Sequence, residues 1–386
     1  MVSPFPNYPM RTALLLALLS LPGAAIAAAA SDPTPARAAV IATMERVADW
    51  QLANPKLPTG PDSENPPKSV EYSPRGWVMG ACDAGIMALA PLADSPRYFD
   101  AMRTMGEKNG WKPGVRIYHA DDHCIVQTYA ELFLRDHQQA EIAPSIARFD
   151  WILAHPAPGT LEFVGENRNT QWSWCDALFM APPAWVRLWQ ATGDTRYLEF
   201  AVTHWWKTSD YLYDRDEHLF FRDSTYFTRR ETNGKKVFWS RGNGWVIGGL
   251  VRVLQFLPAD HPARPKFERQ FKEMMAKLVT LQQPDGYWHS SLLDPEDYPA
   301  KEESGTGFYC YGLAWGINRG LLDRHAYLPA ALKAWKALTE CVQPDGKLVH
   351  VQPIGADPKK FDPERTEPFG VGCFLLAGSE IANLAR

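Results

Sequence analysis

Apolar residues recur with helical spacing along most of the chain, in segments that end at turn residues. Five amphipathic segments begin at Ala38, Arg97, Arg196, Lys266 and Ala326. The last two end at the same sequence, Gln-Pro-Asp-Gly, at residues 283–286 and 343–346. Proline and glycine beyond the last periodic residue are typical helix stop signals. The pattern therefore predicts a mostly helical protein.

The last three segments form a loose internal repeat. They begin 70 and 60 residues apart, and each is followed by a turn, a short extended run and a further apolar segment. A tetratricopeptide array would need a strict period of about 34 residues, which this spacing excludes. Paired helices arranged in a ring fit the repeat better. We predict an all-α fold, an (α/α)6 barrel of six helix hairpins, with the connecting loops around a cleft.

The chain is expected to hold one catalytic domain behind an export signal. Arg11 is followed by an apolar run at residues 13–21 and by the small-x-small pattern of residues 25–27. This order is typical of a cleaved signal peptide, and the apolar run is too short for a membrane anchor. We predict a signal peptide at residues 1–27, a linker with a first helix at 28–67, and a single domain at 68–386. The mature protein would be periplasmic or secreted.

Composition narrows the function. The net charge is −4 without a basic run, which argues against nucleic-acid binding, and 15 Trp residues favour an aromatic-lined sugar cleft. The six cysteines are widely spaced without a CxxC pair, so no zinc site is expected; both buried thiols and a disulfide remain open. Motifs of nucleotide binding, of serine nucleophiles and of HExxH metalloenzymes are absent. We expect no metal and no cofactor.

Two acidic clusters are candidates for catalysis. Asp121 and Asp122 lie between two histidines just before an apolar helix, where one carboxylate can cap the helix and the other can project into the cleft. Asp176 is a lone carboxylate in the aromatic and apolar run 172–180. Because such surroundings raise a carboxyl pKa, Asp176 is the candidate acid. A helix-capping role is the simpler alternative for each of them.

Two glycine-containing segments are candidates for substrate binding. Arg241 lies between Trp239 and Trp245 in residues 238–245, and an arginine fork suits a carboxylate. The segment 302–308, which includes Thr306, reads as a Gly-broken loop before a helix that starts near residue 309. Its backbone could bind sugar hydroxyls, although loop flexibility alone would also explain the glycines.

Together these segments resemble glycoside hydrolase families 88 and 105, the unsaturated glucuronyl and rhamnogalacturonyl hydrolases. The resemblance covers residues 76–377 and is most specific at 174–180, 240–245 and 303–307. It implies an (α/α)6 barrel in which Asp176 is general acid and base and Asp122 assists it. It also implies that Trp174, Arg241 and Trp245 line the sugar site. With Asp122 as the second catalytic residue, we assign Asp121 to substrate binding.

The chain departs from many rhamnogalacturonyl members at one position. Arg222 follows the aromatic run where those members carry a histidine, which leaves a glucuronide substrate equally open. The resemblance implies removal of a terminal 4,5-unsaturated uronic acid by hydration of its double bond, with Arg241 or Arg222 on the carboxylate. Alternatives are an inverting glycosidase on saturated uronides, a polysaccharide lyase and a helical sugar-binding protein.

Overall fold

The structure is a computed structural model, and it describes residues 34–58 and 69–384. The predicted signal peptide and much of the predicted linker lie outside these residues. Within them the chain is mostly helical, with two small antiparallel β-ladders. No helix within residues 34–58 and 69–384 is long and apolar enough to span a membrane.

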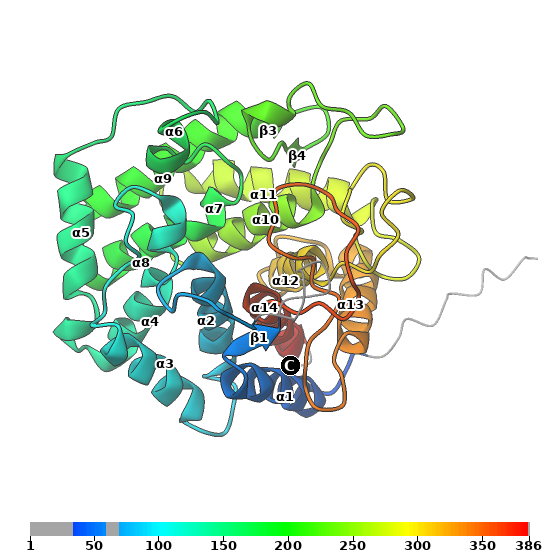
Figure 1. Cartoon of the computed structure of the whole chain (residues 1–386), viewed down its shortest axis with the longest axis horizontal. Coiled ribbons are helices and arrows are strands. Elements are labelled where there is room, and N and C mark those ends of the chain that lie inside the picture. Colours follow the sequence, from blue (N-terminus) through cyan, green and yellow to red (C-terminus); the bar gives the residue numbers. More distant parts are fainter. Residues whose placement is uncertain (1–33, 59–68, 385–386) are drawn as a thin grey trace, which may run out of the picture. The chain divides into compact units, whose positions relative to one another are not determined.

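The helices of the described ranges alternate between an outer and an inner layer (Figure 1). The outer helices are α1 (Arg37–Ala53), α3 (Arg97–Lys108), α5 (Ala143–Ala154), α9 (Thr195–Leu212), α11 (Arg264–Val279) and α13 (Arg324–Glu340). The inner helices are α2 (Trp77–Leu89), α4 (Val126–Asp136), α8 (Pro182–Thr192), α10 (Ser240–Leu254), α12 (Glu303–Asn318) and α14 (Pro368–Leu384). Each inner helix contacts the next, and α14 contacts α2. The predicted (α/α)6 barrel is confirmed.

Shorter elements connect the helices. They are β1 (Lys56–Pro58), β2 (Ser69–Glu71), η1 (Ala120–His123), η2 (Gln139–Glu141), α6 (Asn167–Thr170), α7 (Ala177–Met180), β3 (Tyr213–Asp214), β4 (Leu219–Phe220) and η3 (Ser224–Tyr226), where η marks a 3-10 helix. In the two ladders Lys56 faces Glu71, and Tyr213 faces Phe220.

Burial explains the two layers. The outer helix α3 buries one stripe formed by Tyr98, Met102 and Gly106, whereas every residue of α10 is buried. An amphipathic helix covers a core with one face, and a helix that is apolar on all sides lies inside it. The amphipathic repeat of the sequence therefore belongs to the outer layer.

The ring closes through close backbone contact. A Cβ placed on Gly85 of α2 would lie 2.6 Å from the carbonyl oxygen of Gly372 in α14, so glycine is needed at this crossing. On the other side of α14, Gly378 packs against Met44 of α1. Helix α1 therefore belongs to the same folded unit as the barrel. This unit includes residues 37–53, although the catalytic domain is predicted to begin at residue 68.

Both glycine-containing segments are helical. The segment 240–245 forms the first turns of α10, and α12 begins at Glu303, not near residue 309. The glycines serve packing between helices: Gly242 leaves room for the ring of Trp239, and Gly244 packs against Phe308. The interpretation of residues 302–308 as a flexible loop is therefore wrong, and Glu302 caps the helix by accepting from two backbone N–H groups.

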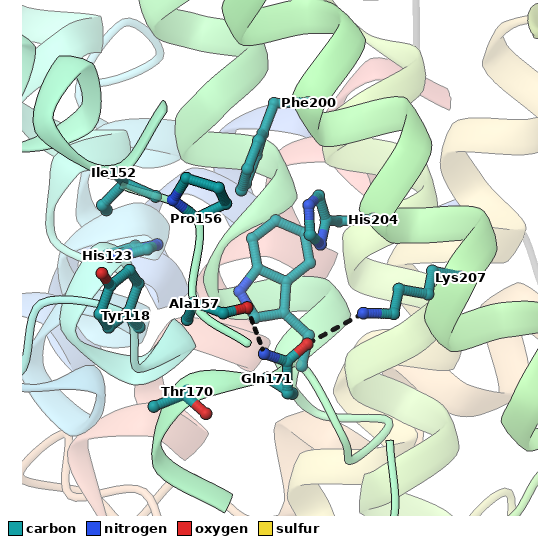
Figure 2. A pocket seen from close by; sticks show the side chains of 11 residues that line it. Tyr118, His123, Ile152, Pro156, Ala157, Thr170, Gln171, Phe200, His204 and Lys207 are labelled. Carbon is teal, nitrogen blue, oxygen red and sulfur yellow. Dashed lines mark hydrogen bonds between the residues drawn. The ribbon is translucent and has the colours of Figure 1, made fainter. Parts of the chain in front are cut away.

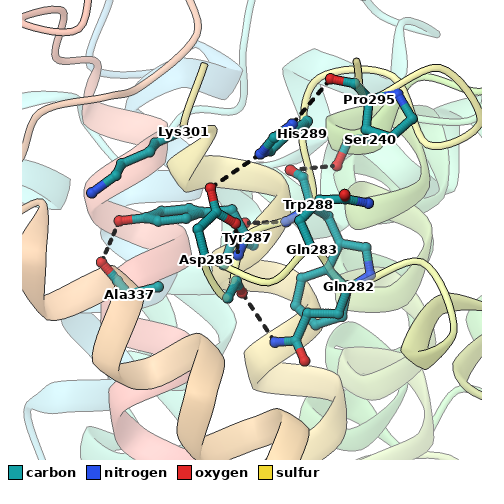
Figure 3. Close-up of polar contacts among 12 residues, drawn as sticks. Ser240, Gln282, Gln283, Asp285, Tyr287, Trp288, His289, Pro295, Lys301 and Ala337 are labelled. Atoms are coloured by element: carbon teal, nitrogen blue, oxygen red, sulfur yellow. Dashed lines mark hydrogen bonds and ion pairs between the residues drawn. The ribbon is translucent and has the colours of Figure 1, made fainter. Parts of the chain in front are cut away.

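A network in residues 282–295 holds the start of α10 (Figure 3). The carbonyl oxygen of Trp288 accepts a hydrogen bond from Ser240, while His289 joins Asp285 to the carbonyl oxygen of Pro295. The backbone N–H of Ser240 also donates to Ser290. These contacts fix the end of α10 that carries Arg241.

Candidate active site

The candidate acidic residues meet where the inner helices begin. Asp121 lies in η1, just before α4, and Asp176 directly precedes α7. Arg222 follows β4, whose Phe220 is held by the side chain of Asn243 in α10. Three separate loops therefore bring two carboxyl groups and one guanidinium to the same end of the barrel.

Asp176 is almost enclosed, with an exposed fraction of 9%. Burial raises the pKa of its carboxyl group, and the nearby positive charge of Arg222 partly opposes this rise. The side chain does not cap α7; its Oδ1 accepts a hydrogen bond from the thiol of Cys175 at 3.2 Å. The capping alternative is therefore not the arrangement that the structure has.

Asp121 interacts electrostatically with Asp176. Burial raises the pKa of Asp121 to about 7, the charges of Asp176 and Asp122 add to the rise, and Arg116 and Arg222 oppose it. Its carboxylate lies 3.5 Å from Arg116 and 3.6 Å from the His119 ring. A pair of interacting carboxyls with raised pKa values retains a proton near neutral pH, as a general acid requires.

Asp122 points elsewhere. Its Oδ2 lies 2.6 Å from Nε of Arg116, and its Oδ1 accepts from the backbone N–H of the same residue. Gly114 packs directly against this carboxyl group. The Asp122 carboxyl group is thus bound to Arg116 and not to a helix end, and Asp121 is the one that interacts with Asp176.

Arg222 supplies the positive charge next to Asp176. Its Nη1 donates to Asp223 at 2.6 Å and its guanidinium lies 4.5 Å above the ring of Phe163. Burial lowers the pKa of Arg222, but the carboxylates of Asp176 and Asp223 raise it by more. The net effect is a raised pKa, so the guanidinium stays charged. Its Nε has no hydrogen-bond partner within residues 34–58 and 69–384. That nitrogen is itself enclosed, whereas the side chain as a whole keeps an exposed fraction of 14% through which the guanidinium can meet an anion.

Trp174 contributes an aromatic ring next to the acidic residues. It pairs with Asp223 in an isolated β-bridge, and its ring lies 4.8 Å from that of His119. Burial lowers the pKa of His119 to about 3, so the imidazole is neutral. The contact between Trp174 and His119 is therefore one between uncharged rings, and the ring of Trp174 is buried.

Arg241 is placed close to the acids but is bound to the backbone. It donates to the carbonyl oxygens of Gln352 at 2.6 Å and Pro353 at 2.8 Å, and its guanidinium lies between the rings of Trp239 and Phe369. Its exposed fraction is 1%. Arg241 thus contributes charge near Asp176, and its Nε, like that of Arg222, has no hydrogen-bond partner within residues 34–58 and 69–384. The two arginines differ in exposure, because the side chain of Arg222 is 14% exposed.

The remaining predicted substrate residues are enclosed. Trp239 donates to the side chain of Gln352, and Thr306 accepts from the backbone N–H of Trp288. Trp245 is 1% exposed and packs edge-on or tilted against Trp77, Phe179, Phe308 and Phe369. None of these three side chains is exposed next to Asp121, Asp176 and Arg222.

A neighbouring cavity of about 60 Å³ lies behind the loop that carries Trp174 (Figure 2). Gln171 links the loop to α9, because it donates to the carbonyl oxygen of Ala157 and accepts from Lys207 at 2.9 Å. Thr208 of α9 donates to the carbonyl oxygen of Trp172. The outer helix thereby fixes the segment that ends at Asp176.

Sequence reasoning missed two residues of the site. Arg116, which separates Asp122 from Asp121, lies in an irregular stretch without a motif, and Phe163 belongs to a polar loop that carries no periodic signal. No group of three or more His, Cys, Asp or Glu side chains in the described ranges is arranged to hold a metal ion. All six cysteines are buried free thiols.

Comparisons with known proteins agree with this geometry. Residues 40–385 match the family described as Glycosyl Hydrolase Family 88. A protein from Formosa agariphila named unsaturated 3S-rhamnoglycuronyl hydrolase is 36% identical over 356 residues, which cover 89% of this chain and 90% of that protein.

Two solved structures share the fold over nearly their whole length. A glycosyl hydrolase family 88 protein from Bacteroides vulgatus has a TM-score of 0.78 and 29% identity, covering 90% of this chain and 99% of that one. A protein named a polysaccharide lyase also has a TM-score of 0.78, with 31% identity and coverage of 90% and 98%. With its barrel and its paired carboxyl groups, the chain is a glycoside hydrolase that belongs to glycosyl hydrolase family 88.

Proposed function

We propose that the enzyme removes a 4,5-unsaturated uronic acid from the end of an oligosaccharide by hydrating the C4=C5 double bond. The observation that carries the proposal is the pair of Asp176 and Asp121, two interacting carboxyls with raised pKa values, next to the guanidinium of Arg222. The relative from Formosa agariphila supports a uronate linked to rhamnose as the substrate.

The terminal sugar is an enol ether conjugated to a carboxylate, and this determines what each residue does. Asp176 donates a proton to C4, which creates an oxocarbenium-like cation at C5. Once that proton has left, the negative charge on the coupled pair of Asp176 and Asp121 stabilises the cation; the resemblance gave the second place in this pair to Asp122. Arg222 binds the substrate carboxylate through its accessible donors.

Water completes the reaction. It adds to C5 and returns one proton to Asp176, so the acid is regenerated. The resulting C5 hemiketal opens to a ketone, and the C1 hemiacetal that remains collapses to an aldehyde and expels the leaving sugar. One carboxyl that donates and then accepts a proton is sufficient for the sequence, in keeping with the acid–base role of Asp176.

The decisive test is the sign of an absorbance change near 235 nm, where the unsaturated uronate absorbs. Purified enzyme is mixed with unsaturated disaccharides that carry rhamnose or another sugar as the leaving group. Loss of absorbance with release of that sugar is the expected result. A polysaccharide lyase, the name of one similar structure, would instead raise the absorbance when it acts on intact polysaccharide. That outcome, without any loss on disaccharides, would overturn the proposal.

We also propose that the enzyme is exported, in line with Arg11, the apolar residues 13–21 and the small residues at 25–27. The expected mature N-terminus lies between residues 28 and 32. N-terminal sequencing of the protein from the periplasmic or culture fraction of its host tests this. Recovery of protein with an intact Met1 from the cytoplasm would contradict it.

A further inference from the structure

The thiol of Cys175 contacts the candidate acid directly. Its Sγ donates to Oδ1 of Asp176 at 3.2 Å, and the side chain of Cys175 is fully buried. Within residues 34–58 and 69–384, no other side chain donates a hydrogen bond to the Asp176 carboxyl group. The backbone N–H of Asp176 adds a local contact, so the thiol is the side-chain donor that acts together with it on this carboxyl group.

Two other segments hold the thiol in place. The backbone N–H of Cys175 donates to the carbonyl oxygen of Arg222 at 2.8 Å. Gly242 of α10 lies against Sγ: a Cβ at this position would be 3.2 Å from the sulfur and 2.9 Å from the ring of Trp239. A larger residue at 242 would push the sulfur away from Asp176. The close contact explains why the glycine-containing start of α10 belongs to this site.

We propose that Cys175 is a positioning residue that orients the Asp176 carboxyl group and reserves Oδ2 for the proton delivered to the substrate. The proposal rests on the function proposed above. Because Oδ1 accepts from the thiol, a proton on the carboxyl group is carried by Oδ2. A thiol is a weak donor, so it can orient the acid without holding it in the charged form.

The donor also acts on the acidity of Asp176. Burial raises the pKa of Asp176, whereas the hydrogen bond from Cys175 lowers it. Cys175→Ala removes the thiol and with it the contribution that lowers the pKa of Asp176. Replacing it by a hydroxyl group, a stronger donor, increases that contribution. The two replacements at one position therefore act in opposite directions, which a loss of packing alone does not do.

Cys310 offers a matched control. Like Cys175, it is fully buried, and it lies in the inner helix α12. Its Sγ donates to the carbonyl oxygen of Ala331, a group that does not titrate. Cys310→Ala removes the same sulfur atom from a similar environment. It reports what a small cavity does to the enzyme without any contact to Asp176.

The experiment measures kcat/KM against pH for wild type, Cys175→Ala, Cys175→Ser and Cys310→Ala on an unsaturated disaccharide. In Cys175→Ala the rate at the wild-type optimum should fall about two- to tenfold, the factor that one ordinary hydrogen bond is worth. The alkaline limb should move to higher pH in Cys175→Ala and to lower pH in Cys175→Ser. Cys310→Ala should leave the limb unmoved. The proposal would be overturned if the alkaline limb of the kcat/KM profile lay at the same pH in all four proteins. It would also be overturned if both Cys175 variants shifted this limb in the same direction.

A second readout separates this proposal from the proposed function. The infrared band of the Asp176 carboxyl group, identified by subtracting the spectrum of Asp176→Asn, is titrated without substrate. Its midpoint should rise in Cys175→Ala and fall in Cys175→Ser. If no unsaturated disaccharide is turned over, the proposed function fails while these shifts still support the role of Cys175. Identical midpoints in an active enzyme reject the role of Cys175 alone.

Discussion

Nε of Arg116 lies 2.6 Å from Oδ2 of Asp122, so the guanidinium binds this aspartate more closely than its neighbour Asp121. The backbone N–H of Arg116 binds the other oxygen of Asp122 at 3.1 Å, so both carboxylate oxygens are occupied. Asp121 has a longer contact of 3.5 Å to the same arginine and interacts electrostatically with Asp176. Two adjacent aspartates thus have separate tasks, one structural and one directed at the site.

This division predicts different losses for two matched variants. Asp121→Asn should lower kcat about 100-fold or more, the lower range for a positioned acid–base group, while leaving the fold intact. Asp122→Asn weakens the contact to Arg116 and should mainly lower the melting temperature. Steady-state kinetics and thermal unfolding of both proteins check this. A larger loss of kcat in Asp122→Asn would restore the role that the resemblance implies for Asp122.

The raised pKa of Asp121 should also lower the free energy of unfolding at alkaline pH. A carboxyl pKa that is raised to about 7 means that the folded state binds the proton more tightly than the unfolded state does. Stability is therefore lost as the pH rises from the usual aspartate range through about 7. Asp121→Asn, which cannot ionise, should unfold about 2–4 °C higher than wild type at pH 8. The difference should vanish near pH 4.

The same titration governs activity. Wild-type kcat should fall as the pH rises through about 7, because the pair then loses the proton that it donates. A rate that stays constant between pH 6 and pH 9 would separate the pair from the rate-limiting proton transfer. If the melting temperatures of wild type and Asp121→Asn remain parallel across pH, the raised pKa of Asp121 is refuted.

The barrel could be predicted because its signal is periodic and local. The outer helices carry amphipathic stripes, and five of the six were predicted from them; α5 was not. Proline and glycine follow α11 and α13 within a few residues, at 284–286 and 344–346. The start of α12 was predicted wrongly, and that of α10 was not predicted. Their glycines look like loop residues, yet they serve contacts with Phe308, Trp239 and Cys373 that only the folded barrel creates.

The site could be predicted in part for the same reason. Asp176 stands out as a carboxylate in an apolar run, which is a local property. The choice between Asp121 and Asp122 depends on Arg116 and on the small size of Gly114, and the choice between Arg222 and Arg241 depends on carbonyl groups more than 100 residues away. Such contacts are set by tertiary structure and leave no local pattern.

The two arginines give the next prediction. Arg222→Met should raise KM and lower kcat/KM about 10- to 100-fold, because a charge-assisted contact to the substrate carboxylate is lost. Arg222→Lys should recover part of the loss, since a point charge cannot reproduce the fork. Arg241→Met should instead destabilise the fold by about 2–4 kcal/mol, because it leaves two buried carbonyl groups without donors. The opposite pattern, normal KM in Arg222→Met and raised KM in a stable Arg241→Met, would assign the uronate to Arg241.

The last prediction separates hydration of a double bond from conventional glycoside hydrolysis. If Asp176 protonates C4, turnover in heavy water should place deuterium at C4 of the released keto sugar. Turnover in water labelled with oxygen-18 should label C5 of that sugar and leave the anomeric carbon of the leaving sugar unlabelled. Asp176→Asn should fold normally and lose about 10²–10⁴-fold in rate.

A conventional inverting glycosidase on the same barrel makes the opposite prediction. It would use two carboxyl groups about 6.5–9.5 Å apart with water between them, accept saturated uronides, and leave C4 without deuterium. The labelled oxygen would then appear at the anomeric carbon of the released uronate. Saturated 4-nitrophenyl glucuronide is the direct control for substrate choice. If it is cleaved as fast as an unsaturated disaccharide, the pair of Asp176 and Asp121 acts as the acid and base of an inverting hydrolase, and the proton assigned to C4 goes to the glycosidic oxygen.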